Sequence, residues 1–215
     1  MIPLRDSVPT RKKPFITYGL ILLNTFVFLL EFLAPNLDEF INQYALIAAN
    51  ISFTDLTTLS PFLTSQFLHA GFAHLIANMW FLKIFGDNVE EAFGHIKYLL
   101  FYLFCGIVSG LAQYIFMMSS TIPMLGASGA VAGILGAYYI FFPRHRVETL
   151  IPVWGFWRIV DLPASFMLLY WFIIQLFAGF GSLVAAPAMV GGIAFFAHAG
   201  GFLAGWVIAK GWRWR

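Results

Sequence analysis

Charged residues and cysteines are scarce in this sequence of 215 residues. Asp, Glu, Lys and Arg together make up 10% of the chain, whereas an average soluble domain contains roughly 25%. Hydrophobic residues make up 60%, and the mean hydropathy is +0.83. The single cysteine, Cys105, excludes an internal disulfide and a metal site built from cysteines. The low charge argues against a soluble domain and indicates a protein that crosses a membrane several times.

Long uncharged stretches divide the chain into membrane spans. No charged residue occurs between Asp161 and Lys210. This stretch is too long for one crossing of about 20 residues and suits two. The sequence therefore predicts an all-α fold, a polytopic bundle of six transmembrane helices. The expected spans lie near residues 15–34, 70–86, 96–118, 124–142, 163–180 and 193–209.

The basic residues are all expected on one side of the membrane. The chain is divided into a basic N-terminal segment, 1–14, a helical domain, 15–209, and a basic tail, 210–215. With six spans, both ends and every loop that carries Lys or Arg fall on the same, cytoplasmic side. The first loop, 35–65, has acidic residues but no Lys or Arg, which suits the outer side. We expect a multi-pass protein of a bacterial inner membrane, because the six-span form is compact. The net charge of +2 requires no nucleic-acid partner.

Three expected spans carry a polar residue at the same depth. His74, Ser128 and His198 each follow shortly after the chain enters the membrane from outside, roughly 5–10 Å below the surface. Asn78 follows His74 by four residues, so it lies on the same helix face one turn deeper. A serine in a membrane helix is usually a packing residue, but polar groups at this depth are costly unless they pair. Their common layer favours a Ser/His pair that performs nucleophilic chemistry.

Glycines mark the faces on which two of these spans are expected to pack. Gly129 and Gly133 in one span, and Gly201 and Gly205 in the last, allow two helix backbones to approach closely. His198 shares the face of the last two glycines, because the three positions follow a helical spacing. Ordinary packing explains the glycines but not the histidine among them. The spacing therefore predicts that this histidine reaches the serine.

Several motifs resemble the rhomboid intramembrane serine proteases. Residues 126–129, Gly-Ala-Ser-Gly, resemble the GxSG nucleophile motif of that family, and residues 197–205 are similar to its final-helix signature. Residues 69–79 resemble its second-helix motif, and residues 86–94 resemble the following turn, in which Glu90 is structural. The resemblance implies an intramembrane serine endopeptidase. Its expected partners are membrane lipid and single-span transmembrane substrates, which it cuts near the outer membrane boundary.

The resemblance and the spacing assign the same chemical roles. Ser128 is expected to be the nucleophile and His198 the general base. The backbone N–H of Ser128 and the side chains of His74 and Asn78 are expected to bind the oxyanion. In the outer half of the bundle only Glu31 is acidic. We therefore expect a dyad and not a triad, with no metal and no cofactor.

The sequence gives several candidates for the residues that admit water to the site and for the group that orients His198. Ser109 and Gln113 match positions that line a water-retaining pocket in rhomboid proteases, and His69 is a further candidate for this cavity. Hydrogen bonding to neighbouring helices is an equally good interpretation of these residues. Ala132 stands where several rhomboids carry an aromatic residue that stacks on the catalytic histidine. Another group must then orient the ring, and the candidates are Tyr138, Phe195 and Phe202.

Two other function classes are open, and the sequence favours neither. A catalytically silent rhomboid-like protein that binds or extracts membrane clients usually lacks the serine or the histidine, and both are present here. A small transporter or channel would carry charged or paired acidic residues in mid-membrane, where this sequence has none.

Two loops are candidates for contact with the membrane or the site. The fifth loop, near 179–187, is a candidate cap. The first loop, with Phe62, Phe67 and Phe72, is a candidate membrane-dipping segment.

Overall fold

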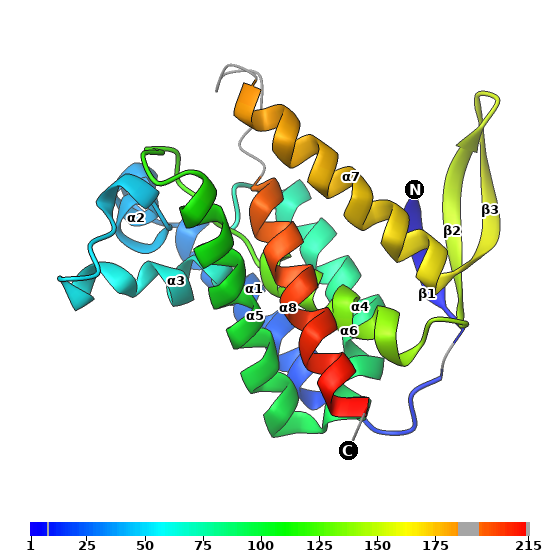
Figure 1. Ribbon diagram of the computed structural model, residues 1–215. Coiled ribbons are helices and arrows are strands. Elements are labelled where there is room, and N and C mark those ends of the chain that lie inside the picture. The colour runs from blue at the N-terminus through cyan, green and yellow to red at the C-terminus, as the bar shows by residue number, and fades with distance from the viewer. Residues whose placement is uncertain (8, 185–193, 214–215) are drawn as a thin grey trace.

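Long helices form the body of the molecule (Figure 1). The computed structural model describes residues 1–7, 9–184 and 194–213. Each long helix overlaps one predicted span, so the predicted helical membrane bundle is confirmed. The long helices are α1 (Phe15–Phe32), α4 (Phe72–Phe93), α5 (His95–Phe116), α6 (Ser128–Phe141), α7 (Ala164–Val184) and α8 (Phe195–Arg213).

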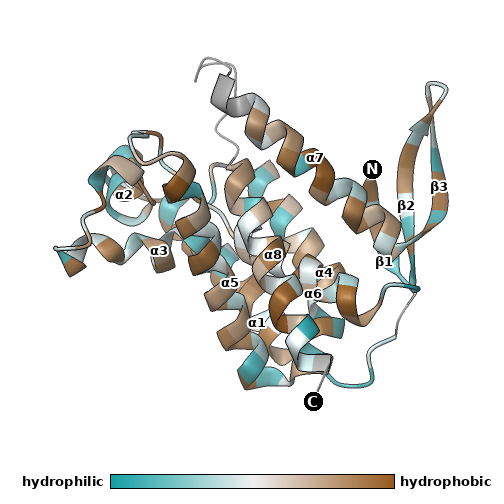
Figure 2. Cartoon of the chain, viewed as in Figure 1, coloured by the Kyte–Doolittle hydropathy of each residue, from teal (hydrophilic) through white to brown (hydrophobic). Residues whose placement is uncertain are grey.

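These helices differ in length and polarity. Within the described residues, α1, α5 and the part of α7 from Ala164 to Gly181 are long and apolar enough to cross a membrane. Figure 2 shows apolar residues along these helices and hydrophilic residues near the C-terminal end of α8. Helix α6 is apolar but has only 14 residues. Its length of about 21 Å is less than the roughly 30 Å of a hydrocarbon core. If its inner end lies at the inner boundary, its first residue lies below the outer one.

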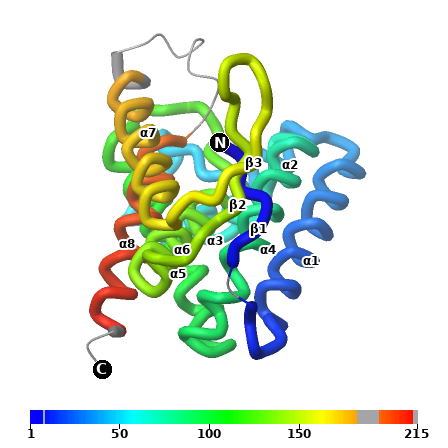
Figure 3. Tube along the Cα trace, turned by 90° about the vertical axis from the view of Figure 1, so that its right-hand side faces the viewer, coloured from blue at the N-terminus to red at the C-terminus, as the bar shows by residue number. Residues whose placement is uncertain are grey.

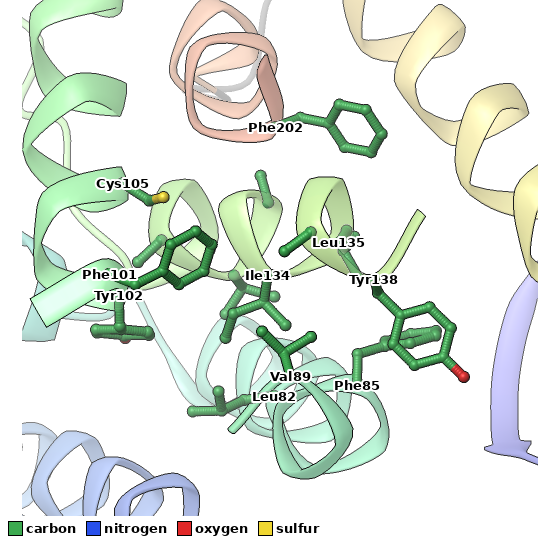
Figure 4. Packing of buried hydrophobic residues seen from close by; sticks show 14 of the residues in the cluster. Leu82, Phe85, Val89, Phe101, Tyr102, Cys105, Ile134, Leu135, Tyr138 and Phe202 are labelled. Carbon is green, nitrogen blue, oxygen red and sulfur yellow. The ribbon is translucent and has the colours of Figure 1, made fainter. Parts of the chain in front are cut away.

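Helix α6 is the central helix of the bundle. Every residue from Gly129 to Tyr138 is buried. Figure 4 shows α6 between Leu82 and Phe85 of α4 on one side and Phe202 of α8 on the other. Because packed interiors leave little free space, this burial holds the start of α6 in place.

Glycines let α6 and α8 approach to backbone contact. A Cβ atom at Gly201 would overlap the carbonyl oxygen of Gly129, and one at Gly205 would overlap that of Gly133. The predicted small-residue faces are therefore the faces through which the two helices meet. This close approach brings the N-terminal turns of both helices together.

The side chain of Glu90 fastens α1 to α4. Helix α1 follows Pro14 and has no side-chain cap of its own. Instead, Glu90 accepts the backbone N–H groups of Ile16 and Thr17 at 2.9 and 2.8 Å, and the Thr17 hydroxyl at 2.7 Å. A carboxylate at a helix N-terminus also complements the helix dipole. This geometry gives Glu90 the structural position that the resemblance implies.

A three-stranded antiparallel sheet is added to the predicted all-α bundle. It consists of β1 (Ile2–Asp6), β2 (Arg146–Val153) and β3 (Phe156–Pro163), in the order β1-β2-β3. Trp154 and Gly155, both with positive φ, form the two-residue turn between β2 and β3. The sequence predicted only a basic segment and a loop here. The pairing joins residues more than 140 positions apart, so no local pattern announces β1.

The sheet lies between α4 and α7 (Figure 3). The indole N–H of Trp80 in α4 donates to the carbonyl oxygen of Pro3 at 2.7 Å. The Tyr138 hydroxyl of α6 and the Asn88 amide of α4 donate to the Asp6 carboxylate at 2.7 and 2.6 Å. These contacts fasten part of the predicted N-terminal segment 1–14 to the bundle.

The first loop is folded, and the fifth is described only in part. Between α1 and α4 lie α2 (Leu37–Tyr44), α3 (Pro61–Thr64) and the 3-10 turns Ala48–Asn50, Leu56–Leu59 and Ser65–Phe67. Phe62 is buried, whereas Phe72 is exposed and contacts the rings of Phe28 and Phe32. Insertion of this loop into a membrane stays a prediction. The predicted cap in the fifth loop falls largely on residues 185–193, which lie outside the described residues.

Candidate active site

Ser128 and His198 form a direct contact. Ser128 is the first residue of α6, and His198 lies in the first turn of α8. The distance between His198 Nε2 and Ser128 Oγ is 2.7 Å, within the range of a strong hydrogen bond. The glycine contacts between α6 and α8 bring the two residues this close. The structure therefore joins two residues that are 70 positions apart in the chain.

The second ring nitrogen of His198 contacts α7. Its Nδ1 atom lies 2.8 Å from Oε1 of Gln175. The ring of Trp171, one helical turn earlier in α7, lies 5.9 Å from the imidazole between centroids, at an interplanar angle of 35°. An amide oxygen only accepts hydrogen bonds, so a hydrogen bond at this contact requires the proton on Nδ1, which leaves the lone pair of Nε2 facing Ser128.

The residues expected to orient the His198 ring do not contact it, so this prediction is wrong. Tyr138 donates its hydroxyl to Asp6, far from the histidine in the bundle. Phe202 stacks on Phe172 of α7 at 4.6 Å, and Phe195 lies beside Gly179. Among the described residues, Trp171 is the one aromatic residue whose ring contacts that of His198.

Gln175 was missed at the sequence level, although a signal was present. It is the only amide side chain in α7, which is otherwise built mainly from apolar residues. A lone amide in a membrane helix is costly unless it has a partner, and the expected partner is another polar group at the same depth.

His74 and Asn78 of α4 lie on the other side of the serine. The backbone N–H of Ala70 donates to His74 Nδ1 at 3.4 Å, which leaves the proton on Nε2. Within the described part of the chain, the Asn78 Nδ2 atom is buried and has no hydrogen-bond partner. Both side chains border the space beside Gly126. A Cβ atom there would lie 2.8 Å from His74 Nε2 and 3.7 Å from Asn78 Nδ2.

The first turn of α6 offers further donors. The first helical hydrogen bond runs from the Val131 N–H to the Ala127 carbonyl oxygen. The N–H groups of Ser128, Gly129 and Ala130 therefore have no acceptor within the helix. The helix dipole adds a partial positive charge at this end. The start of α6 is thus suited to an oxyanion beside Ser128 Oγ.

Glu31 does not hydrogen-bond to His198. Its carboxylate accepts the backbone N–H of His69 at 3.0 Å. The ring of His69 lies 5.2 Å from that of His74 and is 2% exposed. None of the described carboxylates forms a hydrogen bond with His198, whose ring contacts Gln175 and Ser128. His69 and Glu31 thus lie behind the oxyanion side and not beside Ser128.

Two of the three candidates for water access, Ser109 and Gln113, border the helices that carry the Ser/His contact. Ser109 of α5 packs against Gly129, where a Cβ atom would overlap its hydroxyl oxygen. Gln113 accepts the backbone N–H of Ala197 at 3.3 Å. Gln113 therefore hydrogen-bonds to the neighbouring helix α8, which was the other interpretation of this residue. A water pathway through these residues stays a prediction.

Metal ligands do not gather in the described residues: no group of three His, Cys, Asp or Glu side chains is placed to hold an ion.

Comparison with known proteins identifies the family. The family model described as the Rhomboid domain matches residues 57–214, which include every residue of the Ser/His contact and the oxyanion side. The chain belongs to the rhomboid family. RHOMBOID-like protein 6, mitochondrial, of Arabidopsis thaliana is 32% identical over 146 residues, covering 68% of this chain and 41% of that protein.

Other relatives include a second mitochondrial protein and a bacterial protein. Presenilin-associated rhomboid-like protein, mitochondrial, of Bos taurus is 30% identical over 64% of this chain and 36% of its own length. Rhomboid protease GluP of Bacillus subtilis (strain 168) is 36% identical over 58% of this chain and 24% of its own length. The chain thus spans less than half the length of these relatives. The family shows an integral membrane protein, but the mitochondrial relatives do not support the expected bacterial inner membrane.

Proposed function

We propose that this rhomboid-family chain is an intramembrane serine endopeptidase. It cleaves single-span membrane proteins near their outer membrane boundary through a dyad of Ser128 and His198. The observation that carries the proposal is the 2.7 Å contact between His198 Nε2 and Ser128 Oγ at the start of a buried helix. A protonated Nδ1 leaves Nε2 as the acceptor that a general base requires.

In the acylation step, Ser128 Oγ attacks the carbonyl carbon of the scissile peptide bond. His198 Nε2 takes the hydroxyl proton as the new C–O bond forms. The carbonyl oxygen becomes an oxyanion, which accepts hydrogen bonds from the Ser128 N–H, His74 Nε2–H and Asn78 Nδ2–H. When the C–N bond breaks, the imidazolium gives its proton to the leaving amine. An acyl-enzyme on Ser128 remains.

In the deacylation step, a water molecule attacks the acyl carbon. His198 accepts a proton from this water, and the same donors stabilise the second oxyanion. Collapse of the intermediate breaks the C–O bond to Ser128 and returns the proton to Oγ. The carboxylic acid product leaves and loses its remaining proton to solvent, and the dyad is restored.

The depth of Ser128 sets the expected cleavage position. Because α6 is short and begins at Ser128, the nucleophile lies a few residues below the outer boundary. A peptide bond inside an intact helix is shielded by its own turns, so the substrate must unwind locally. Substrates with Gly or Pro near the cut meet this need at lower cost. Both termini lie on the cytoplasmic side, because the basic residues gather there.

An inactive rhomboid-like protein is the alternative within the same family. Such a protein has no need of a serine and a histidine in hydrogen-bond contact, nor of an adjacent buried Asn78 with an unpaired amide. The combined presence of the contact, the unpaired amide and the free helix amides favours the protease.

Covalent labelling tests the proposal. A fluorophosphonate probe reacts with a serine hydroxyl only when a base activates it. We expect the purified protein to be labelled on Ser128 and the Ser128→Ala and His198→Ala variants to be unlabelled. Ser109→Ala, which removes another buried serine of the bundle, should still be labelled on Ser128. Equal labelling of all four proteins, or none of the wild type, would contradict the proposal.

A further inference from the structure

We propose, resting on the proposed function, that Gln175 is a positioning residue for the general base. It holds His198 in the tautomer whose Nε2 atom faces Ser128, and α7 thereby supplies the third member of the catalytic arrangement. Two atoms of one ring carry this inference. Nε2 lies 2.7 Å from Ser128 Oγ, and Nδ1 lies 2.8 Å from Gln175 Oε1.

The imidazole is held from two helices at once. Helix α6 contributes Ser128, whereas α7 contributes Gln175 and the ring of Trp171. The two α7 residues are four positions apart and so lie on the same face of the helix. Gln175 contacts the ring at Nδ1, and the Trp171 ring lies beside the imidazole at an interplanar angle of 35°. Together they restrict both the position and the rotation of the ring.

The choice of tautomer decides whether the ring acts as a base. A neutral imidazole carries one proton, on Nδ1 or on Nε2. With the proton on Nε2, the ring has no lone pair for the serine proton. The Oε1 atom of Gln175 stabilises the other tautomer by accepting the Nδ1 proton. An aspartate performs this orienting role in the Ser-His-Asp triad.

An uncharged amide suits the depth of this site. A carboxylate buried in a membrane protein carries a large desolvation cost. Glutamine orients the ring without that cost, but it stabilises the imidazolium less than a carboxylate does. This explains how the site operates when Glu31, the acidic residue of the outer half, contacts His69 instead.

Helix α7 is at the edge of the bundle, so the base depends on a peripheral helix. Its outward face exposes large apolar side chains, among them Ile173, Ile174 and Phe177. Its inward face stacks Phe172 on Phe202 of α8, at 4.6 Å and 24°. This stacking fixes the level of Gln175 relative to His198. Undocking of α7 would therefore remove the orienting hydrogen bond.

Nitrogen NMR of the ring tests the tautomer directly. The full-length protein is labelled with ¹⁵N-histidine, and the His198 signals are assigned by comparison with His198→Gln. We expect a protonated Nδ1 and an unprotonated Nε2 in the neutral wild type and in the control variant Ile174→Met. In Gln175→Met, a nearly isosteric change, the signals should shift to a mixture of both tautomers. An Nε2-protonated wild type, or an unchanged Gln175→Met spectrum, would overturn the inference.

Kinetics give a second readout. Gln175→Met should lower kcat by about 10- to 100-fold, with KM within about twofold. This is less than the roughly 10⁴-fold effect of neutralising the charged third member of a triad. Gln175→Glu keeps an acceptor and should restore kcat to within about tenfold of wild type.

The two readouts separate this inference from the proposed function. Retained kcat in Gln175→Met would show that Gln175 does not position the base. If the wild type cleaves nothing but the NMR result is as expected, the proposed function fails and the tautomer assignment stands. If the protein cleaves substrate while the spectrum does not depend on Gln175, only the positioning role fails.

Discussion

Gly126 explains why the residue two positions before the candidate nucleophile has no side chain. Its φ of +124° is a conformation that residues with a Cβ rarely adopt. A Cβ atom would also lie 2.7 Å from His74 Cε1, too close for any real contact. The glycine thus serves both the backbone turn that exposes Ser128 and the space in which an oxyanion would lie.

Comparing Gly126→Ala with a control variant should separate the backbone strain from the clash with His74. Gly126→Ala is expected to displace His74 and to lower kcat by up to about 10²–10³-fold, the loss typical of one oxyanion donor. The matched control is Gly94→Ala, which has a φ of +78° but open space around its Cβ position. Both variants should lose about 1–2 kcal/mol of stability from backbone strain. Equal kcat values in the two variants would show that His74 is not part of the site.

The side-chain donors themselves should affect turnover more than binding. His74→Ala is expected to lower kcat by up to about 10²–10³-fold, and Asn78→Ala by less, because the Ser128 N–H remains. Asn24→Ala is the control, since Asn24 is another buried asparagine and donates to the Leu20 carbonyl in α1. Steady-state kinetics on a model substrate provide the measurement. A change confined to KM would mean that these side chains only position the substrate.

Most individual residues of the candidate site could be predicted from the sequence, but their second partners could not. Ser128 and His198 stand out because a polar residue at membrane depth needs a reason. Gln175 has the same signal, but its partner lies 23 positions away on another helix. Sequence spacing reports faces within one helix and not contacts between two, so the link between Gln175 and His198 required the structure.

At the scale of elements, the contact between α6 and α8 determines whether the dyad exists. Gly201→Val should push the carbonyl of Gly129 away and separate the two helices. We expect a loss of about 1–3 kcal/mol in the free energy of unfolding, together with loss of activity. Gly211 on the same helix has no neighbour within 4 Å of its Cβ position. Gly211→Val should therefore change neither the free energy of unfolding nor the activity. A stable and active Gly201→Val protein would disprove this role of the contact.

The attachment of α1 to α4 is a second test at this scale. Glu90→Ala removes the acceptor for two backbone N–H groups and one hydroxyl of α1. The expected loss is about 3 kcal/mol or more, since each buried donor left unpaired costs about 1–3 kcal/mol. Glu91→Ala, which removes only an exposed contact with the Arg11 N–H, should have little effect. Equilibrium unfolding in mixed micelles provides the comparison. Equal stability of the two variants would refute the structural role of Glu90.

The starts of the long helices could be predicted from the sequence, whereas the sheet could not. Each long helix begins within about four residues of its predicted span, because apolar length is a direct consequence of membrane thickness. Strand β1 has only five residues. Its partner, β2, lies in the loop between α6 and α7, far away in the sequence. Such pairing depends on tertiary contacts, for example the one between Trp80 and Pro3.

At the scale of the whole molecule, the arrangement predicts where a substrate is cut. The dyad lies at the N-terminal ends of α6 and α8, and both helices run from the outer toward the inner side in the proposed topology. A single-span substrate should therefore be cut near its outer membrane boundary. It should be cut more slowly when Leu and Ala replace the helix-weakening residues near the cut.

Mass spectrometry of cleaved model substrates tests the central claim most directly. Purified wild-type protein, Ser128→Ala and His198→Ala are incubated in liposomes with a single-span substrate. The expected result is one cluster of cuts near the outer boundary with the wild type, and none above a few per cent with either variant. Cuts at the cytoplasmic end, or persistent cleavage by Ser128→Ala, would contradict an intramembrane protease that acts through Ser128 and His198.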